Sequence, residues 1–477
     1  MDKQIIKIAL ISFQQDADRV PPVGLVYLAT YLKEKLGIEN IKIIDKNYHD
    51  IEKELEEYLP DLVGVGAMTV DYGEVLRFAK NFKQKHSTPI IIGGVHISTL
   101  PESFEACFDV GVIGEGEQTL AELINLFLEK GKFEEKDLAK IKSTVFFYKG
   151  KLAKTPLREN IELDSLPFPD FSFVNPDYFK EKEVPGTSEI RKKYYILSSR
   201  GCPYQCVFCS TTRFWSKVRL HSPDYVAELI KQGIENYGAN HFAIMDDLFT
   251  INKERLRELR KSFEKYGLLD KIKGIEVQPR ANLIDDEMCQ LMKDINIKIV
   301  NFGFESGSEK MLKWLKGDSV TVEMNRQAVI LCKSYGLQVY GSLMFGSPGE
   351  TIEDIKQTLE FIDFVVENKA RYVWSFVATP FPATPFWNIA LERGRVSNHM
   401  DWDILSHHNL DNPLLLDENI DREEFKKLFL QGRKKLRKLK FIIIKDFIKS
   451  HPFRAVKMLA TEPAYYIGRF VKQVYKQ

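Results

Sequence analysis

Residues 199–210 read SRGCPYQCVFCS, and this stretch decides how the 477-residue chain is organised. It holds three of the six cysteines, Cys202, Cys206 and Cys209, in a Cys-x3-Cys-x2-Cys pattern. The apolar run 194–197 predicts a strand that leads into the stretch, and the glycine and proline beside the first cysteine predict a bend. The three thiols are therefore expected on one loop at the carboxyl end of a strand, where they can converge on one centre.

Three thiolates on one loop suit an iron–sulfur cluster better than the other centres that cysteines build. A structural zinc site commonly takes four protein ligands, and the nearest extra candidate, His221, stands alone. A disulfide framework is a poorer explanation, because the three cysteines of the stretch are an odd number and disulfides persist in oxidising compartments, whereas this chain looks cytosolic. A four-iron, four-sulfur cluster with three thiolate ligands leaves one iron open, and that iron can bind a small molecule through an amine and a carboxylate. Zinc, or thiols packed in a loop, are the alternatives.

The composition is that of an ordinary globular chain of about three domains. Hydrophobic residues make up 44% of it and the formal net charge is +1, so the overall charge favours no class of partner. The first residues lack the apolar run and cleavage site of a signal peptide. No stretch reaches the ~18 apolar residues of a membrane-spanning helix. Because cysteine is also sparse, we expect a reducing, cytoplasmic location.

The first third of the chain alternates short apolar strands with helices, which predicts a doubly wound, Rossmann-like parallel sheet. The predicted strands are 5–13, 41–44, 62–66, 89–92 and 110–113. In such sheets, ligands bind beyond the carboxyl ends of the strands. The residues expected at that edge are Thr69, Gly93, Gly94, His96, Gly114, Glu115 and Gly116.

Three motifs of this region resemble the cobalamin-binding domain that precedes many radical S-adenosylmethionine (SAM) domains. They are PPxGL at 21–25, GGxH at 93–96 and GEGE at 114–117. The resemblance implies a cobalamin cofactor held by the residues at that edge, although some relatives keep the fold without cobalamin. Members that place a histidine on cobalt carry Asp-x-His-x-x-Gly, whereas residues 45–50 here read DKNYHD. We therefore expect no protein histidine below the metal; His49 is a poor candidate, and His96 either lines the pocket or has a structural role.

A linker follows this region. Residues 144–147 and 151–153 flank Tyr-Lys-Gly and predict a hairpin. The segment 166–171, LPFPDF, is rich in proline and aromatic residues and predicts an extended tether between two domains.

Six more strands, with helices between most of them, are predicted in the central part of the chain. They are 194–197, 242–245, 275–277, 297–302, 339–345 and 372–377. Polar residues gather where these strands end, which is where barrels of this kind carry their chemistry. Together with the cysteine spacing and the aromatic residue before the last cysteine, this pattern resembles the radical SAM superfamily. It implies that family's partial (β/α)6, TIM-like barrel.

The resemblance also implies a role for each strand-end group. Cys202, Cys206 and Cys209 would ligate a [4Fe–4S] cluster, and a bound SAM would occupy the open iron. Two acidic residues stand where the superfamily often has Gly-Gly-Glu, so which carboxylate binds SAM is open. Asp246 or Asp247 would bind the amino group of SAM, and Arg280 would bind its carboxylate. Glu305 and Ser306 would contact the ribose or the methionine. Gly346 and the main chain near Phe208 would contact the adenine.

From residue 401 the pattern changes to helices and becomes strongly basic. Residues 423–439 predict a basic helix, and 433–477 hold thirteen lysines and arginines against two acidic residues, a net charge of +11. Basic residues mixed with large apolar ones suit a helix that lies on an anionic membrane surface. The alternatives are a solvated helix packed on the barrel and a nucleic-acid contact. No recognised binding module accompanies the charge, so no nucleic-acid partner is expected.

These observations predict four regions: a cobalamin-binding-like Rossmann domain at 1–143, a hairpin and Pro/aromatic linker at 144–190, a radical SAM barrel at 191–400 and a helical basic region at 401–477. The reaction implied by the resemblance is reductive cleavage of SAM to a 5′-deoxyadenosyl radical, hydrogen abstraction from an unactivated carbon and methylation of that carbon. No catalytic residue is assigned.

The expected substrate is a small molecule, and the basic tail suggests a lipid or isoprenoid. Two other functions stay open. One is radical rearrangement, ring formation or carbon–carbon coupling without methyl transfer. The other is a cobalamin or iron–sulfur sensor that does no chemistry. The further expected partners are an electron donor such as flavodoxin or ferredoxin and, through the tail, the inner face of the membrane.

Overall fold

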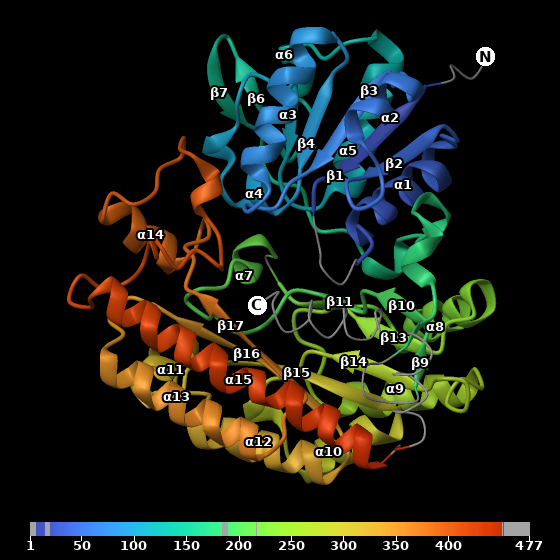
Figure 1. Cartoon of the computed structure of the whole chain (residues 1–477). Coiled ribbons are helices and arrows are strands. Elements are labelled where there is room, and N and C mark those ends of the chain that lie inside the picture. The colour runs from blue at the N-terminus through green and yellow to red at the C-terminus, as the bar shows by residue number, and fades with distance from the viewer. Residues whose placement is uncertain (1–5, 15–19, 184–188, 216, 451, 453–477) are drawn as a thin grey trace.

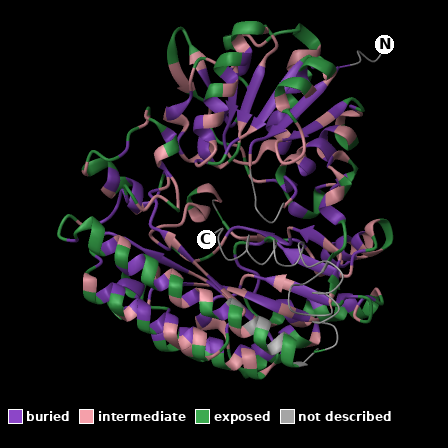
Figure 2. Ribbon diagram, in the orientation of Figure 1, coloured by how far each residue is buried: buried purple, intermediate pink, exposed green. Residues whose placement is uncertain are grey.

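The computed structural model describes residues 6–14, 20–183, 189–215, 217–450 and 452 (Figure 1). Two mainly parallel sheets organise them, one in the N-terminal third and one in the centre. In Figure 1 the N-terminal sheet stands above the central sheet, and the short helix α7 (Thr211–Phe214) lies between the two. Figure 2 shows that most strands of both sheets are buried, while the outward faces of the surrounding helices are exposed.

The N-terminal sheet has the strand order β2-β1-β3-β4-β5-β6-β7. Its first five strands are parallel, and every residue of β1 is buried, as expected when helices cover both faces of a sheet. The doubly wound sheet predicted from the sequence is therefore confirmed. Its strands are β1 (Ile8–Ser12), β2 (Ile41–Asp45), β3 (Leu62–Gly66), β4 (Ile90–Gly93), β5 (Val110–Val112), β6 (Thr144–Tyr148) and β7 (Lys151–Lys154). Its helices are α1 (Val23–Leu36), α2 (Ile51–Tyr58), α3 (Tyr72–Lys85), α4 (Val95–Thr99), α5 (Gly116–Lys130) and α6 (Glu135–Leu138).

The β6–β7 hairpin lies differently from the prediction, which placed it in the linker. Strand β6 pairs antiparallel with β5, with Val145 opposite Gly111, so the hairpin extends the N-terminal sheet. Burial gives the reason: Val145 and Phe146 are buried, and a free linker hairpin would leave both side chains in water. The predicted limit at residue 143 thus cuts through this sheet, and the other domain limits stay predictions.

The central sheet has the order β10-β13-β14-β15-β16-β17, and all of its strands are parallel. Helices follow the strands in turn, which confirms the partial (β/α)6 barrel. Helix α8 begins at a proline, and Ser222 caps it by accepting a hydrogen bond from Tyr225 N. The strands are β10 (Lys193–Ile196), β13 (His241–Ile244), β14 (Gly274–Val277), β15 (Ile297–Glu305), β16 (Gln338–Phe345) and β17 (Tyr372–Val377). The helices are α8 (Pro223–Tyr237), α9 (Lys253–Lys265), α10 (Asp286–Asp294), α11 (Glu309–Lys316), α12 (Val322–Ser334), α13 (Ile352–Glu367) and α14 (Pro385–Glu392).

Two small antiparallel pairs complete the sheets. The strands β8 (Lys182–Glu183) and β9 (Ile190–Arg191) pair beside the linker, and β11 (Ser199–Arg200) pairs with β12 (Arg219–Leu220) around the cysteine loop. The second pair ties the two ends of that loop together.

The C-terminal part is helical, as predicted, and its helix is longer than the sequence indicated. Helix α15 (Arg422–Ser450) runs along α13, and Gly432 allows the close approach, because a Cβ there would lie 3.1 Å from Leu359. The basic and apolar stretch after residue 452 lies outside the described residues. None of the helices in the described ranges is long and apolar enough to cross a membrane.

Candidate functional site

A cavity of about 410 Å³ separates the carboxyl ends of the N-terminal strands from the central sheet. On the N-terminal side, apolar side chains alternate with a set of glycines, here called the glycine wall: Gly64, Gly66, Gly93, Gly94, Gly114 and Gly116. On the central side, its lining includes Leu197, Ser199, Arg200, Trp215, Met245 and Asp247. One space therefore touches both the predicted glycine turns and the residues that flank the cysteine loop.

Two of these glycines hold backbone conformations that other residues rarely adopt. Gly94 has φ +96°, and a Cβ there would lie 2.7 Å from the carbonyl oxygen of Ala67. Gly114 has φ +80° and faces open space. The wall at both turns is therefore bare backbone, which allows a bulky ligand to approach closely.

Thr69 and His96, both predicted at the ligand site, are not among the residues that line the cavity. His96 is fully buried; its Nδ1 lies 3.2 Å from Thr69 Oγ1 and its Nε2 lies 2.9 Å from Ser103 Oγ. Its ring also stacks on Tyr72, with 3.8 Å between centroids. Burial lowers the pKa of His96 to about 3, so the ring is neutral. These contacts match the structural role that was the alternative for His96.

The three predicted cluster ligands lie on the loop that precedes α7. Cys206 is buried, and Cys202 and Cys209 are half-buried. The loop is fixed to α11, because Val207 N donates a hydrogen bond of 3.0 Å to Leu315 O. Among the described residues, no three His, Cys, Asp or Glu side chains are arranged around a single metal-ion position.

Arg280 follows β14 and points at the cysteine loop. Its side chain is buried, its Nη1 lies 3.3 Å from Cys206 Sγ, and its Nη2 donates to Lys316 O at 3.0 Å. The guanidinium also lies 3.8 Å from the centre of the Tyr204 ring. Within the protein, Arg280 thus contacts a predicted cluster ligand, and its contact with the SAM carboxylate stays a prediction.

The two aspartates after β13 have different surroundings. Asp246 is buried and accepts hydrogen bonds from Ser198 N at 2.7 Å and Ser199 N at 3.0 Å, so it fixes the end of β10. Asp247 lines the cavity and accepts a hydrogen bond of 3.0 Å from Thr211 Oγ1. Of the two carboxylates whose roles the sequence left open, Asp247 is the one that a ligand can reach.

Glu305 is the last residue of β15 and Ser306 follows it; of the two, Glu305 shows backbone strain. Glu305 has φ +62°, which is rare for a residue with a Cβ, and the strand register shifts just before it. Its buried carboxylate lies 3.9 Å from Lys316 Nζ. Ser306 is fully buried, and its hydroxyl lies 3.2 Å from Thr358 Oγ1, so it packs against α13. Strain of this kind tends to gather at functional sites, which favours Glu305.

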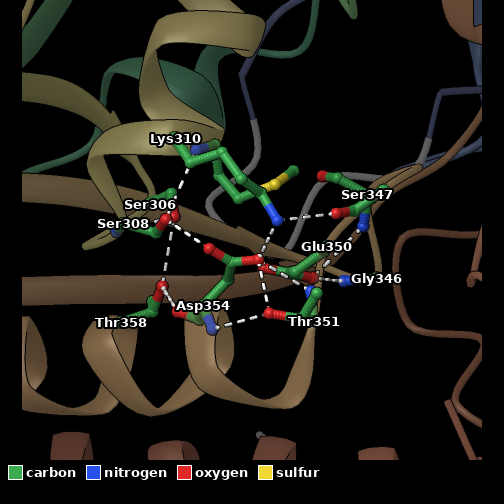
Figure 3. A network of polar contacts seen from close by, with 11 residues as sticks. Ser306, Ser308, Lys310, Gly346, Ser347, Glu350, Thr351, Asp354 and Thr358 are labelled. Atoms are coloured by element: carbon green, nitrogen blue, oxygen red, sulfur yellow. Dashed lines mark hydrogen bonds and ion pairs between the residues drawn. The ribbon is translucent and has the colours of Figure 1, made fainter.

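Gly346 begins the turn after β16, and its position is fixed by Glu350 (Figure 3). Its N–H donates to Glu350 Oε2 at 2.5 Å, and Ser347 N donates to the same oxygen at 3.3 Å. The neighbouring Asp354 accepts from Ser308 Oγ at 2.6 Å. This network joins the ends of β15 and β16 to the start of α13, so two predicted SAM-binding turns form one unit.

The buried Glu350 carboxyl predicts a pH-dependent contribution to stability. Burial raises its pKa from 4.5 to about 8, against the two N–H donors that lower it. Between these values the folded state keeps a proton that the unfolded chain has released. The contribution is therefore fully present below pH 4.5 and is lost as the pH rises through about 8.

We expect the free energy of unfolding of the wild type to fall more steeply between pH 5 and 8.5 than that of Glu350→Gln. The expected difference is at least about 1.4 kcal/mol, one pKa unit, measured by urea unfolding at both pH values. Equal losses in the two proteins would show that the carboxyl stays ionised.

Phe208 precedes the last cysteine of the loop and is half-buried. Its ring lies 6.3 Å from that of Phe386 in α14. The side chain thus packs outward against α14, which is compatible with the prediction that only the main chain near it contacts a ligand.

Four buried charges connect the GEGE turn to the cysteine loop. Arg200 Nη1 donates to Glu115 at 2.5 Å and Nη2 donates to Glu117 at 2.6 Å, while Arg219 Nη2 donates to Glu115 at 2.6 Å. The side chains are only 6–12% exposed. Burial opposes ionisation of Glu115, but the two guanidinium groups keep its pKa below the ordinary value. Glu115, predicted as a ligand-binding residue, therefore also fixes the position of the segment that leads to Cys202.

Comparisons with known proteins agree with this architecture. The model of the radical SAM superfamily matches residues 196–362, and that of the B12 binding domain matches residues 7–124. An uncharacterized methyltransferase of Pyrococcus horikoshii is 30% identical over 455 residues, which cover 92% of this chain and 93% of that protein. This chain belongs to the radical SAM superfamily. Within it, the chain is an enzyme of the cobalamin-dependent radical SAM methyltransferase family.

Two further proteins show how far the likeness extends. The anaerobic magnesium-protoporphyrin IX monomethyl ester cyclase of Rubrivivax gelatinosus is 25% identical, over 85% of this chain and 71% of that protein. The radical SAM methyltransferase TsrM of Kitasatospora setae, solved with cobalamin and a [4Fe–4S] cluster, has a TM-score of 0.64 and 21% identity, over 81% of this chain and 74% of that chain. The second likeness concerns the fold.

The cofactors of this radical SAM enzyme are a [4Fe–4S] cluster, SAM and cobalamin. The cavity fits a bulky cofactor on its B12-domain side, because the glycine wall leaves backbone where side chains would fill the space. No histidine is among the described residues that line the cavity. On the radical SAM side, the Ser199 hydroxyl is buried without a partner and lines the same cavity, so one polar group is left for a ligand.

Several residues of the radical SAM site were not predicted from the sequence. Two of them, Arg200 and Glu117, belong to the buried charges. Trp215 covers these charges, because the centre of its ring lies 5.5 Å from the Arg200 guanidinium. Lys316 lies beside Glu305 at the end of α11. The one available signal was position: Arg200 stands two residues before Cys202, and Glu117 is the second acid of the GEGE motif. Lys316 carries no motif, because only the fold brings α11 to the cysteine loop.

Gly24 offers a direct test of which ligand fills the B12-domain side of the cavity. It lies in α1, lines the cavity, and an added Cβ would meet nothing within 4 Å. Gly24→Trp should therefore fold and occupy cavity space, and we expect it to weaken cobalamin binding at least about tenfold, or 1.4 kcal/mol. Gly24→Ala is the matched control, since alanine favours a helix and takes little space.

The measurement is the absorbance change of the anaerobic protein during titration with hydroxocobalamin. Equal affinities in the tryptophan and alanine variants would place the cofactor elsewhere.

Proposed function

We propose that this chain methylates an unactivated carbon of a lipid or isoprenoid small molecule by radical SAM chemistry. The observation that carries the proposal is that one cavity reaches from the glycine wall to the start of the cysteine loop. A methyl donor on one side and a radical source on the other would both face a substrate held there.

The residues would divide the work as follows. Cys202, Cys206 and Cys209 would hold the cluster, Asp247 would take the amino group of SAM, and Gly93, Gly94 and Gly114 would support cobalamin. When bound, the cluster supplies the electron that splits SAM, and cobalamin supplies methyl-transfer chemistry. The chain's own part is to orient these groups and to keep water out, for which the aromatic lining beside Trp215 is suited.

The choice of an apolar substrate rests on two features. Much of the cavity lining that is not glycine is hydrophobic, including Leu10, Leu25, Leu28, Val65, Leu120 and Leu197. In addition, the basic helix α15 exposes large apolar side chains: Leu430 is 45%, Phe441 54% and Ile448 47% exposed. This combination suits contact with an anionic membrane surface, which is where a lipid substrate would be found.

The product mixture tests the methyl transfer. Each methyl group would consume two molecules of SAM: one becomes S-adenosylhomocysteine, and the other becomes methionine and 5′-deoxyadenosine. The anaerobic, reduced protein with SAM, cobalamin and an isoprenoid mixture should yield both nucleoside products. 5′-Deoxyadenosine without S-adenosylhomocysteine would count against a methylase.

That outcome would favour the second candidate, a radical ring-forming or rearranging enzyme without methyl transfer. The likeness to a protein named as a cyclase, over 85% of this chain, supports this candidate. The two functions share the cavity and the cysteine loop, so the site residues do not separate them.

The membrane contact and the electron donor have their own tests. Sedimentation with vesicles rich in anionic lipid should remove the protein from solution at low salt, and neutral vesicles should not. A chain that stays in solution with both kinds of vesicle would leave α15 a packing element.

The electron donor is tested by the source of the electron for SAM cleavage. A small acidic carrier such as flavodoxin or ferredoxin should support this cleavage in place of dithionite.

A further inference from the structure

A buried arginine lies against one of the three predicted cluster ligands. Arg280 Nη1 is 3.3 Å from Cys206 Sγ, and the arginine is 6% exposed. Its other terminal nitrogen, Nη2, donates to Lys316 O at 3.0 Å and to Ser319 Oγ at 3.1 Å. One end of the guanidinium is therefore fixed by protein oxygens, and the other end is directed at the sulfur.

The ring of Tyr204 fixes the plane of this guanidinium. The centre of the ring lies 3.8 Å from the guanidinium carbon, and Asn282 Nδ2 donates a hydrogen bond of 3.1 Å to the Tyr204 hydroxyl. Tyr204 stands between Cys202 and Cys206 in the loop. The loop that supplies the thiolates thus also supplies the surface on which the arginine is stacked.

Two basic side chains, Arg280 and Lys316, are buried close to Cys206. Lys316 is buried at the end of α11, and its ammonium group lies 3.9 Å from the Glu305 carboxylate. Glu305 therefore offsets the charge of Lys316, whereas the Arg280 guanidinium is in direct contact with Cys206. A buried charge acts through a lower dielectric than an exposed one, so its effect on a neighbouring group is larger.

We propose that Arg280 sets the reduction potential of the cluster by donating a hydrogen bond to the Cys206 thiolate. Hydrogen bonds to cluster sulfurs and nearby charges are known levers on cluster potentials. The reduced cluster carries one more negative charge than the oxidised one, so an N–H donor and a positive charge stabilise the reduced form more. Arg280 therefore makes the cluster easier to reduce by an external donor. The inference rests on the assignment of Cys206 as a cluster ligand.

The test compares three variants with the wild type, each reconstituted anaerobically with iron and sulfide and measured without SAM. Arg280→Gln removes the charge and the fork of donors. Arg280→Lys keeps the charge but not the planar donor pair. Arg213→Gln is the matched control: Arg213 is also close to the loop, where it donates to Gln205 at 3.0 Å, but it is exposed to solvent.

The readout is the midpoint potential of one-electron reduction. The electron paramagnetic resonance signal of the reduced cluster monitors that reduction. For Arg280→Gln we expect the equilibrium constant of reduction to fall at least about tenfold, which is 59 mV for one electron. Arg280→Lys should lie between this variant and the wild type. Arg213→Gln should stay within about twofold of the wild type, because water screens an exposed charge.

A potential of Arg280→Gln equal to that of Arg213→Gln would overturn the proposal. If the same variant then bound SAM more weakly, Arg280 would be a ligand of the SAM carboxylate instead. Should Arg280→Gln fail to retain iron, Arg280→Lys decides: an unchanged potential overturns the proposal, and a lowered one supports it. A wild-type chain without iron would instead reject the ligand assignment. Because the measurement needs neither substrate nor cobalamin, its result is independent of the proposed methyl transfer.

Discussion

Replacing Cys206 with serine is expected to abolish SAM cleavage, with a loss of more than about 100-fold. Changes to residues that only orient metal ligands already cost 10–100-fold, and Cys206 is predicted to be a ligand itself. It is also the most buried of the three loop cysteines, so a serine there leaves a hydroxyl with little access to water. Formation of 5′-deoxyadenosine under reducing conditions measures the loss.

Cys107→Ser is the matched control for this variant. Cys107 is a free, half-buried cysteine in the N-terminal domain, far in sequence from the loop. Its replacement should leave the iron content and the cleavage rate within about twofold of the wild type, because most substitutions away from a functional site or a packed core contact have small effects. A Cys206→Ser protein that retained the wild-type iron content and cleavage rate would remove this cysteine from the ligand set.

Replacing Arg200 with methionine is expected to destabilise the chain by about 3–5 kcal/mol, the usual cost of removing one partner of a buried ion pair. The change leaves Glu115 and Glu117 buried with a single remaining cation, Arg219, which pairs with Glu115 but not with Glu117. Because these charges join α5 to the segment before Cys202, the cysteine loop should loosen as well. Urea unfolding measures the first effect, and loss of iron on gel filtration measures the second.

Arg77→Met provides the comparison for this variant. Arg77 pairs with Asp403 at 2.7 Å, but both side chains are more than half exposed, and exposed pairs contribute about 0–1 kcal/mol. If Arg200→Met lost no more stability than Arg77→Met, the four buried charges would not join the two domains energetically.

The order of the elements could be predicted from the sequence, because burial on both sides of a parallel sheet leaves short apolar runs at each strand. The six central strands and the first five N-terminal strands were found in this way. Strand ends then indicated the site, since parallel strands bring their carboxyl ends to one edge. Gly93, Gly94 and Gly114 do line the cavity.

Side-chain direction could not be predicted from the sequence. Asp246 and Asp247 are adjacent, yet one fixes a neighbouring strand and the other faces the cavity. His96 follows two glycines that line the cavity, but its ring turns into the core. The β6–β7 hairpin was assigned to the linker because its pairing partner, β5, lies more than thirty residues earlier in the chain. Each of these outcomes depends on contacts between distant segments.

Metal analysis of one anaerobically reconstituted sample tests most directly whether a cluster-bearing loop faces a cobalamin cavity. The chain should hold about four iron atoms and about one cobalt atom, and Cys206→Ser should lose iron while keeping cobalt. Zinc in place of iron, or iron without cobalt after incubation with hydroxocobalamin, would contradict a site built from these two cofactors.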